Sequence, residues 1–202
     1  EQGGFGGCFV DLALILEQLG RGLVPEPLIP SIVLAGGLLS RLGTDAQREA
    51  FLTPMIEGRT SLALAYAERQ SRYQLADCRT RAKQSGAGWL LDGDKTWVLN
   101  GHAADHILVA ARTADGPRDA KGLSLFVVDG NAKGVERIRV PGMDGQRTAL
   151  LRLRGVEVGA DRLLGAESGA LPHLEWAIDR GAAAACAEGQ GAVQELFERT
   201  VA

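Results

Sequence analysis

Trp97 is the residue whose type and setting best suit the binding of a flat ligand. It lies in segment 88–101, where two short apolar runs flank Asp92-Gly93. An Asp-Gly pair in that setting predicts a tight hairpin turn, because such turns need positive φ at their central residues. Trp97 then falls near the end of the second strand, beside backbone donors. Its aromatic face suits a planar cofactor, and the alternative is that the side chain packs in the core.

Two arginines, Arg69 and Arg72, could bind an anionic ligand. Arginine binds phosphate and carboxylate groups through paired hydrogen bonds, so the two side chains form a candidate clamp. The alternative is that both are solvated loop residues. His102 and His106 have the spacing of metal ligands on a helix, but they flank a predicted turn and a strand start, and no third ligand is evident. The sequence therefore predicts no metal site.

The composition argues against several kinds of partner. The 202 residues carry 22 basic and 25 acidic side chains, a net charge of −3 and no basic tract, so neither nucleic acid nor an anionic membrane is an expected partner. No apolar run approaches the length of a membrane span, and no signal peptide is recognisable. Three widely spaced cysteines, Cys8, Cys78 and Cys186, suggest free thiols in a reducing compartment.

The elements that must position these residues fall into three stretches with different hydrophobic periods. Residues 1–60 have helical spacing, with a capping box at Thr44-x-x-Gln47. From 61 to 164, short apolar runs alternate with turn residues, which is typical of a β-barrel or sandwich. After residue 164 the helical period returns, and its small residues predict a close helix neighbour in a tight bundle with segments absent from this chain. The predicted stripe consists of Leu171, Leu174, Ile178, Ala182, Ala185, Gly189, Val193 and Leu196.

The motifs of the chain resemble those of acyl-CoA dehydrogenases, in family order and over essentially the whole length. Segment 88–101 is similar to the family's G-x-x-L-N-G-x-K-x-W-I-T-N-G. Residues 103–113 resemble A-D-x-x-x-V-x-A-R-T, and residues 122–128 resemble G-I-S-x-F-x-V. Residues 156–165 resemble D-V-x-V-P-x-x-x-L-L-G, and Glu17-Gln18-Leu19-Gly20 is similar to the family's E-E-L-G helix.

The resemblance implies an α+β multidomain chain. Residues 1–60 would be the end of an α-helical N-terminal domain, 61–164 a β-barrel middle domain, and 165–202 the first helix of a C-terminal helical bundle. The chain starts without Met and ends within a helical pattern, so we expect it to be a piece of a longer protein. The loop that follows residue 66 resembles a bacterial branch that includes small subunits of pimeloyl-CoA dehydrogenase-like enzymes, which implies a cytoplasmic location.

The activity that the resemblance implies is FAD-dependent α,β-dehydrogenation of an acyl-CoA thioester. A carboxylate takes the α-proton, flavin N5 takes the β-hydride, and an electron-transfer flavoprotein or similar acceptor reoxidises the flavin. The protein would form a homo- or hetero-oligomer. Two alternatives stay open: a non-catalytic partner subunit of a hetero-oligomeric acyl-CoA dehydrogenase, and a flavin monooxygenase on the same fold. The fragment alone is expected to be inactive.

The resemblance also implies roles for individual residues. Cofactor binding falls to Tyr66, Ala67, Glu68, Trp97, Val98 and Leu99, and substrate binding to Arg69, Arg72, Tyr73 and Arg180. Ala67 and Leu99 stand where the family has threonine, so two hydroxyl donors are lost while the backbone N–H groups remain. One such hydrogen bond contributes about 0.5–1.5 kcal/mol, which predicts a weakened flavin site or a subunit without flavin.

Asp179 is the candidate for the catalytic base. Ala177-Ile178-Asp179-Arg180 aligns with a D-x-E-R version of the family's motif, and this puts Asp179 on the glutamate position. A buried carboxylate beside an arginine fits a general base. The alternative is a helix-surface residue with a charged neighbour.

Overall fold

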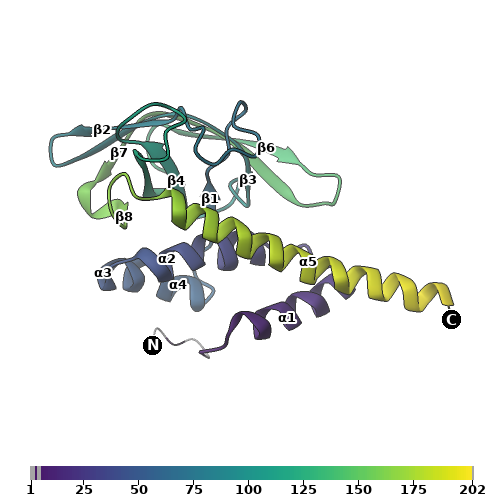
Figure 1. Cartoon of the computed structure of the whole chain (residues 1–202). Coiled ribbons are helices and arrows are strands. Elements are labelled where there is room, and N and C mark those ends of the chain that lie inside the picture. The colour runs from purple at the N-terminus through teal and green to yellow at the C-terminus, as the bar shows by residue number, and fades with distance from the viewer. Residues whose placement is uncertain (1–2, 4–5, 202) are drawn as a thin grey trace.

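The computed structural model describes Gly3 and residues 6–201. Along the sequence, helices precede and follow a strand-rich region, and in space they lie on one side of the strands (Figure 1). The first helical part consists of α1 (Phe9–Arg21), η1 (Ile29–Gly36), α2 (Gly37–Leu42), α3 (Asp45–Gln47), η2 (Arg48–Leu52) and α4 (Thr53–Ile56). The strands are β1 (Leu62–Ala65), β2 (Arg81–Ser85), β3 (Gly88–Leu99), β4 (His106–Arg112), β5 (Leu123–Asp129), β6 (Val135–Pro141), β7 (Arg147–Gly159) and β8 (Leu163–Leu164). A short turn of helix, η3 (Ala160–Arg162), precedes β8, and α5 (Leu171–Val201) follows it. The predicted order of helical, stranded and helical parts is confirmed.

Side-chain chemistry explains where the helix at residue 45 begins. The Thr44 hydroxyl accepts a hydrogen bond from the Gln47 N–H at 3.2 Å, and the Gln47 side-chain oxygen accepts one from the Thr44 N–H at 3.0 Å. The predicted capping box is therefore confirmed. The Gln47 side-chain amide also donates to the carbonyls of Asp161 and Leu163 at 2.7 and 2.9 Å. The same residue thus ties the helical part to the chain beyond β7.

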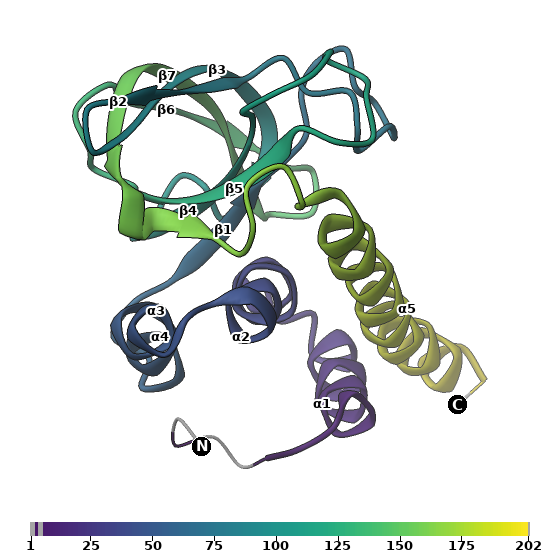
Figure 2. The same ribbon diagram turned by 60° about the vertical axis from the view of Figure 1, so that its left-hand side comes forward.

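The strands form one curled eight-stranded sheet (Figure 2). Its order is β6-β7-β3-β2-β4-β5-β8, and β1 pairs in parallel with β4. In the described part of the chain the terminal strands β6 and β8 do not pair with each other, so the sheet is open and the prediction of a closed β-barrel was wrong. Closure needs a continuous ladder around the ring, and β8, with two residues, is too short to supply one.

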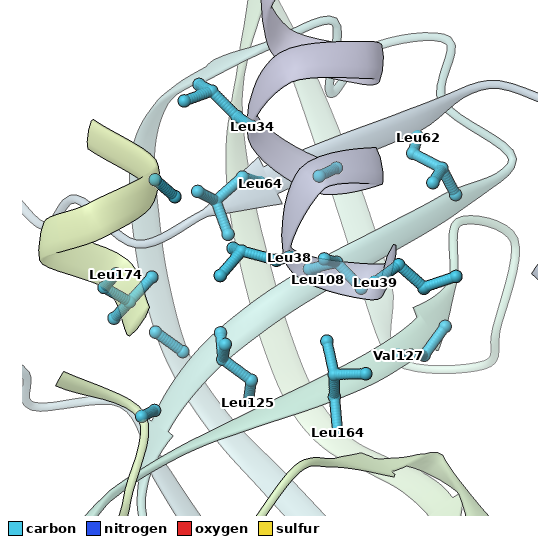
Figure 3. Packing of buried hydrophobic residues seen from close by; sticks show 14 of the residues in the cluster. Leu34, Leu38, Leu39, Leu62, Leu64, Leu108, Leu125, Val127, Leu164 and Leu174 are labelled. Atoms are coloured by element: carbon cyan, nitrogen blue, oxygen red, sulfur yellow. The ribbon is translucent and has the colours of Figure 1, made fainter. Parts of the chain in front are cut away.

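Each face of the sheet covers its own hydrophobic core. Leu108 and Leu125 belong to a cluster that packs the sheet against η1, α2 and α5 (Figure 3). Their neighbours in the strands, Val109 and Phe126, belong to a second cluster on the opposite face. β4 and β5 are therefore buried on both faces, which explains why their sequences are nearly continuous apolar runs.

The predicted hairpin turn at Asp92-Gly93 is wrong. β3 continues through this pair, and the turn between β2 and β3 lies at Gly86, which has a φ of +58°. A Cβ at Gly93 would lie only 2.6 Å from the Thr80 Cα. The Asp92 carboxylate accepts a hydrogen bond from the Gly155 N–H at 2.8 Å, at an irregularity in the β3–β7 ladder. Glycine at position 93 therefore permits a close backbone approach within a strand.

The packed face of α5 differs from the predicted stripe. Its buried residues are Leu174, Ala177, Gly181, Ala184 and Gly191. Val193 and Leu196, which the stripe included, are 63% and 68% exposed. A helix does lie close to α5, but it is α1 of this chain and not the expected segment outside it: a Cβ at Gly20 or Gly191 would overlap the backbone of the other helix. Small side chains decide the face because they let the two backbones approach. No helix among the described residues is long and apolar enough to cross a membrane.

We expect Gly191→Ala to destabilise the protein, although alanine is normally the better helix former by about 1 kcal/mol. A Cβ at Gly191 would overlap the Glu17 carbonyl oxygen in α1, and overpacking of this kind costs about 1–3 kcal/mol. Gly189→Ala is the matched control on the same helix, because a Cβ there meets nothing within 4 Å. In thermal or urea unfolding, Gly189→Ala should exceed the wild type in stability and Gly191→Ala should fall below it. Equal shifts for the two variants would contradict the close contact.

Candidate active site

A β-bulge in β3 presents Trp97. Lys95 still pairs with Leu151 of β7, but the ladder resumes only at Val98, so Thr96 and Trp97 together oppose Leu150. Trp97 has a φ of +51°, in a region that non-glycine residues rarely adopt, and the residue is 62% exposed. Backbone strain of this kind costs about 1–3 kcal/mol and clusters at binding and catalytic sites. The bulge is therefore a reason to look for a ligand site at this point.

The Glu68 carboxylate holds the loop that follows β1. It accepts hydrogen bonds from the Lys95 ammonium at 2.7 Å, the Thr80 N–H at 2.9 Å and the Thr80 hydroxyl at 2.7 Å. The Arg79 N–H and the Gln70 side-chain amide donate to it at 2.8 and 2.7 Å. One buried carboxylate thus connects the loop at 68–70, the segment before β2, and β3. Glu68 was predicted to bind the cofactor, and the structure places its carboxylate among these protein donors.

The Glu68–Lys95 pair is an ionised pair in the protein interior. Burial would raise the pKa of Glu68, but the charge of Lys95 and the hydrogen bonds from Lys95, Gln70 and Thr80 outweigh it and lower the pKa to about 2. The Lys95 side chain is 0% exposed. Removing one partner of such a pair leaves a buried uncompensated charge, which costs about 3–5 kcal/mol. Beside it, burial raises the pKa of the Cys78 thiol, which donates to Glu68 at 3.3 Å.

Backbone N–H groups near Trp97 are available as donors. The Thr96 N–H donates to the Ala67 carbonyl at 2.9 Å, which fixes Ala67 beside the bulge. Among residues that the structure describes, none accepts a hydrogen bond from the Ala67 N–H. The Asn100 N–H donates to the Arg147 carbonyl at 3.4 Å, so the alternation of the antiparallel ladder directs the Leu99 N–H away from β7.

The other residues predicted to bind the cofactor have different surroundings. Tyr66 is half-buried and packs against the core between sheet and helices, where burial raises the pKa of its hydroxyl. Val98 is 1% exposed and belongs to the core on the opposite face. Leu99 is 36% exposed. Of the six residues predicted to bind the cofactor, Ala67 and Trp97 therefore lie together at the bulge, next to the hydrogen-bond network of Glu68.

A cavity of about 810 Å³ lies against the bulge. Its lining consists of Glu68, Arg69, Gln70, Arg79, Thr80, Gly93, Asp94, Lys95, Thr96, Trp97, Leu150, Leu151 and Arg152. Arg69 was among the predicted substrate residues, whereas Arg79 and Arg152 were missed. No local motif marks these two arginines, because they come from the segment before β2 and from β7 and meet only in the folded sheet.

Arg72 and Tyr73, also predicted to bind substrate, do not line this cavity. Arg72 is exposed and has a φ of +48°, and Tyr73 is 98% exposed. Both lie in the loop that Glu68 anchors. The structure describes no residue that packs over the Tyr73 ring.

Asp179 and Arg180 do not pair with each other. Asp179 is exposed on the face of α5 opposite its buried residues, and it has no ion pair with any described residue. The Arg180 guanidinium stacks on the rings of Phe9 and Trp176, at 4.3 and 5.0 Å from their centroids. It lines a separate cleft of about 430 Å³ between α1, α2 and α5. The two residues therefore point into different surroundings.

The fold and the site are those of a ligand-binding protein built on a helix-covered sheet. Helices cover one face of an open curled sheet, and a strained bulge in that sheet presents the aromatic ring of Trp97 at a cavity, with the free amide of Ala67 next to the bulge. The model of the acyl-CoA dehydrogenase N-terminal domain matches residues 1–59, and the model of the acyl-CoA dehydrogenase middle domain matches residues 63–156. The chain belongs to the acyl-CoA dehydrogenase family.

Individual relatives agree with this assignment. The chain is 33% identical to the long-chain specific acyl-CoA dehydrogenase of Rattus norvegicus mitochondria over 86% of its own length and 42% of the relative's. It superposes on butyryl-CoA dehydrogenase from Megasphaera elsdenii with a TM-score of 0.92 and 25% identity, over 99% of this chain and 54% of that one. It superposes on the prolyl acyl carrier protein oxidase AnaB with a TM-score of 0.91 and 26% identity, over 99% and 55%. The chain thus spans about half the length of these relatives.

Proposed function

We propose that the full-length protein catalyses FAD-dependent α,β-dehydrogenation of an acyl-CoA thioester. The observation that carries this proposal is the exposed, strained Trp97 at the bulge of β3. A protein that keeps a large aromatic residue at positive φ and in solvent gains nothing from it in stability, so a binding role explains it better than packing. We further propose that residues 1–60, 61–164 and 165–202 belong to three domains of the full-length protein.

The residues at the bulge fit a flavin ring. The indole of Trp97 supplies a flat apolar face, and the free N–H of Ala67, with that of Leu99, supplies donors for ring oxygen and nitrogen atoms. Bound FAD would supply the hydride acceptor. The part of this chain is to hold the ring through Trp97 and to stabilise negative charge on it through backbone dipoles whose positions are already fixed. The buried Glu68–Lys95 pair does not contact the ring in this proposal. It fixes the loop that carries Ala67.

Asp179 is proposed as the base that removes the α-proton. Its carboxylate is free of any partner in the described chain, and it lies on the face of α5 that no described element covers. A general base must be able to reach the substrate, and no described side chain holds the Asp179 carboxylate in a hydrogen bond or ion pair. Further proposals taken from the family are an electron-transfer flavoprotein as acceptor, assembly into an oligomer, a cytoplasmic location and membership of the branch of pimeloyl-CoA dehydrogenase small subunits.

Two other functions are favoured by specific observations. Both side-chain hydroxyls of the family's flavin contacts are absent at Ala67 and Leu99, which favours a non-catalytic partner subunit. The likeness to AnaB, an acyl carrier protein oxidase, favours an oxygen-using flavin enzyme on this fold, such as a monooxygenase. Substrate turnover with and without oxygen separates this last function from dehydrogenation.

The full-length protein, purified with its natural partner chains, is expected to contain FAD or to bind added FAD. Stacking of the flavin ring on Trp97 should shift the visible flavin spectrum and quench Trp97 fluorescence. Absorption spectroscopy of the purified protein, followed by titration with FAD, measures this. Copurification without flavin, together with an unchanged spectrum on titration, would overturn the dehydrogenase proposal and favour the partner subunit.

A further inference from the structure

The acidic groups of the Trp97 cavity are already neutralised. Glu68 is paired with Lys95 at 2.7 Å, and the Asp94 carboxylate is paired with Arg154 at 2.8 Å. Asp77, which lies close to the cavity behind Gln70, is paired with Arg118 at 2.9 Å. The carboxylates around the cavity therefore leave little negative charge to balance further arginines.

Two arginines of the lining have no such partner. In the chain that the structure describes, Arg69 and Arg79 have no carboxylate within ion-pair distance, and both are exposed at the cavity. A third, Arg152, contacts Glu136 at 3.4 Å, where both side chains are more than half exposed. Exposed pairs of this kind are weak. The cavity is therefore positively charged overall.

The buried network of Glu68 holds the two arginines near each other. Arg69 directly follows Glu68 in the loop, and the Arg79 N–H donates to the Glu68 carboxylate at 2.8 Å. One carboxylate with its full set of donors thus fixes the backbone of both residues. Guanidinium groups on a fixed backbone lose less freedom when they bind, and they bind phosphate through paired charge-assisted hydrogen bonds.

We infer that Arg69 and Arg79 form a binding site for a phosphate group at the cavity that Trp97 lines. The inference rests on the proposed function in one respect, since a ligand that carries both a flat ring and phosphate would occupy Trp97 and the arginines together. Phosphate reaches this cavity from one of two sources: the flavin nucleotide or the coenzyme A part of the substrate. Both present the same phosphate-ester oxygens to the two guanidinium groups.

The test is isothermal titration of the flavin-free full-length protein with FAD, FMN, riboflavin and inorganic pyrophosphate, and of the FAD-loaded protein with coenzyme A and pantetheine. The variants are Arg69→Gln and Arg79→Gln. Arg81→Gln is the matched control, because Arg81 is an exposed arginine of the neighbouring strand that lies outside the cavity. Pyrophosphate should bind to the wild type and to Arg81→Gln, and roughly tenfold or more weakly to the other two, as expected for loss of charge-assisted hydrogen bonds.

The two sources give different results. If the flavin supplies the phosphate, FAD and FMN bind more tightly than riboflavin, and Arg79→Gln removes that preference. If the substrate supplies it, Arg79→Gln removes the preference for coenzyme A over pantetheine instead. Unchanged pyrophosphate binding and unchanged preferences in both variants would overturn the inference. If no flavin binds but pyrophosphate still binds through these arginines, the proposed function fails and the phosphate site stands.

Discussion

Asp179→Asn in the full-length protein should slow reduction of the bound flavin by acyl-CoA by about 10²–10⁴-fold, the usual share of general base catalysis. Binding of FAD and of acyl-CoA should be unchanged, because the Asp179 side chain has no hydrogen bond or ion pair with a described residue and lies in α5, outside the Trp97 cavity. Rapid mixing of FAD-loaded protein with substrate, followed at the flavin absorbance, measures the step directly. Asp179→Glu should keep part of the rate, since it retains the carboxylate.

Glu175→Gln is the matched control for this experiment. Glu175 lies one helical turn before Asp179 and is exposed on α5 as well. If Asp179 acts as the base, the two variants will differ by the full size of the effect. If Asp179→Asn reduces the flavin as fast as Glu175→Gln and the wild type do, the base lies elsewhere in the full-length protein.

Replacing Trp97 should weaken FAD binding by about 10–100-fold, because aromatic stacking contributes about 0.5–1.5 kcal/mol beyond burial, and covering one face of the ring contributes about half of the 1.5–3 kcal/mol for full burial of a large side chain. Trp97→Gly is the informative variant. Glycine adopts positive φ without strain, so the bulge should keep its shape and the protein should be at least as stable as the wild type. Equilibrium titration with FAD, combined with thermal unfolding, separates the two effects.

Two further variants make the Trp97 experiment specific. Trp97→Phe retains an aromatic face and should bind FAD more tightly than Trp97→Gly. Met143→Ala removes another exposed large apolar side chain, outside the cavity, and should bind FAD like the wild type. Undiminished FAD binding by Trp97→Gly would show that the indole is not the surface on which the ring lies.

The sequence alone determined the order of the elements and the family. Hydrophobic periods separate the helical and stranded parts, and these periods are local, since each reflects which residues of one element face a core. The capping box at Thr44 was equally readable, because its two hydrogen bonds join residues three positions apart. The motif around Trp97 indicated the family because its spacing is fixed within one stretch of chain.

Only the tertiary structure decided how the candidate site is built. Glu68 and Lys95 are 27 residues apart, and no local pattern indicates that one neutralises the other in the interior. The same limit applies to Arg79 and Arg152, which line one cavity with Trp97 only in the folded sheet. It also applies to Gly93, where a glycine is needed because the Thr80 backbone lies close to it.

The curl of the sheet and the packed face of α5 were decided in the same way. The sheet stays open because β8 offers two residues for pairing, which no count of apolar runs predicts. α5 packs through Gly181 and Gly191, although Val193 and Leu196 of the same helix are exposed. Burial of small residues gains little area each, but it lets backbones approach, and that gain depends on a partner helix far away in the sequence.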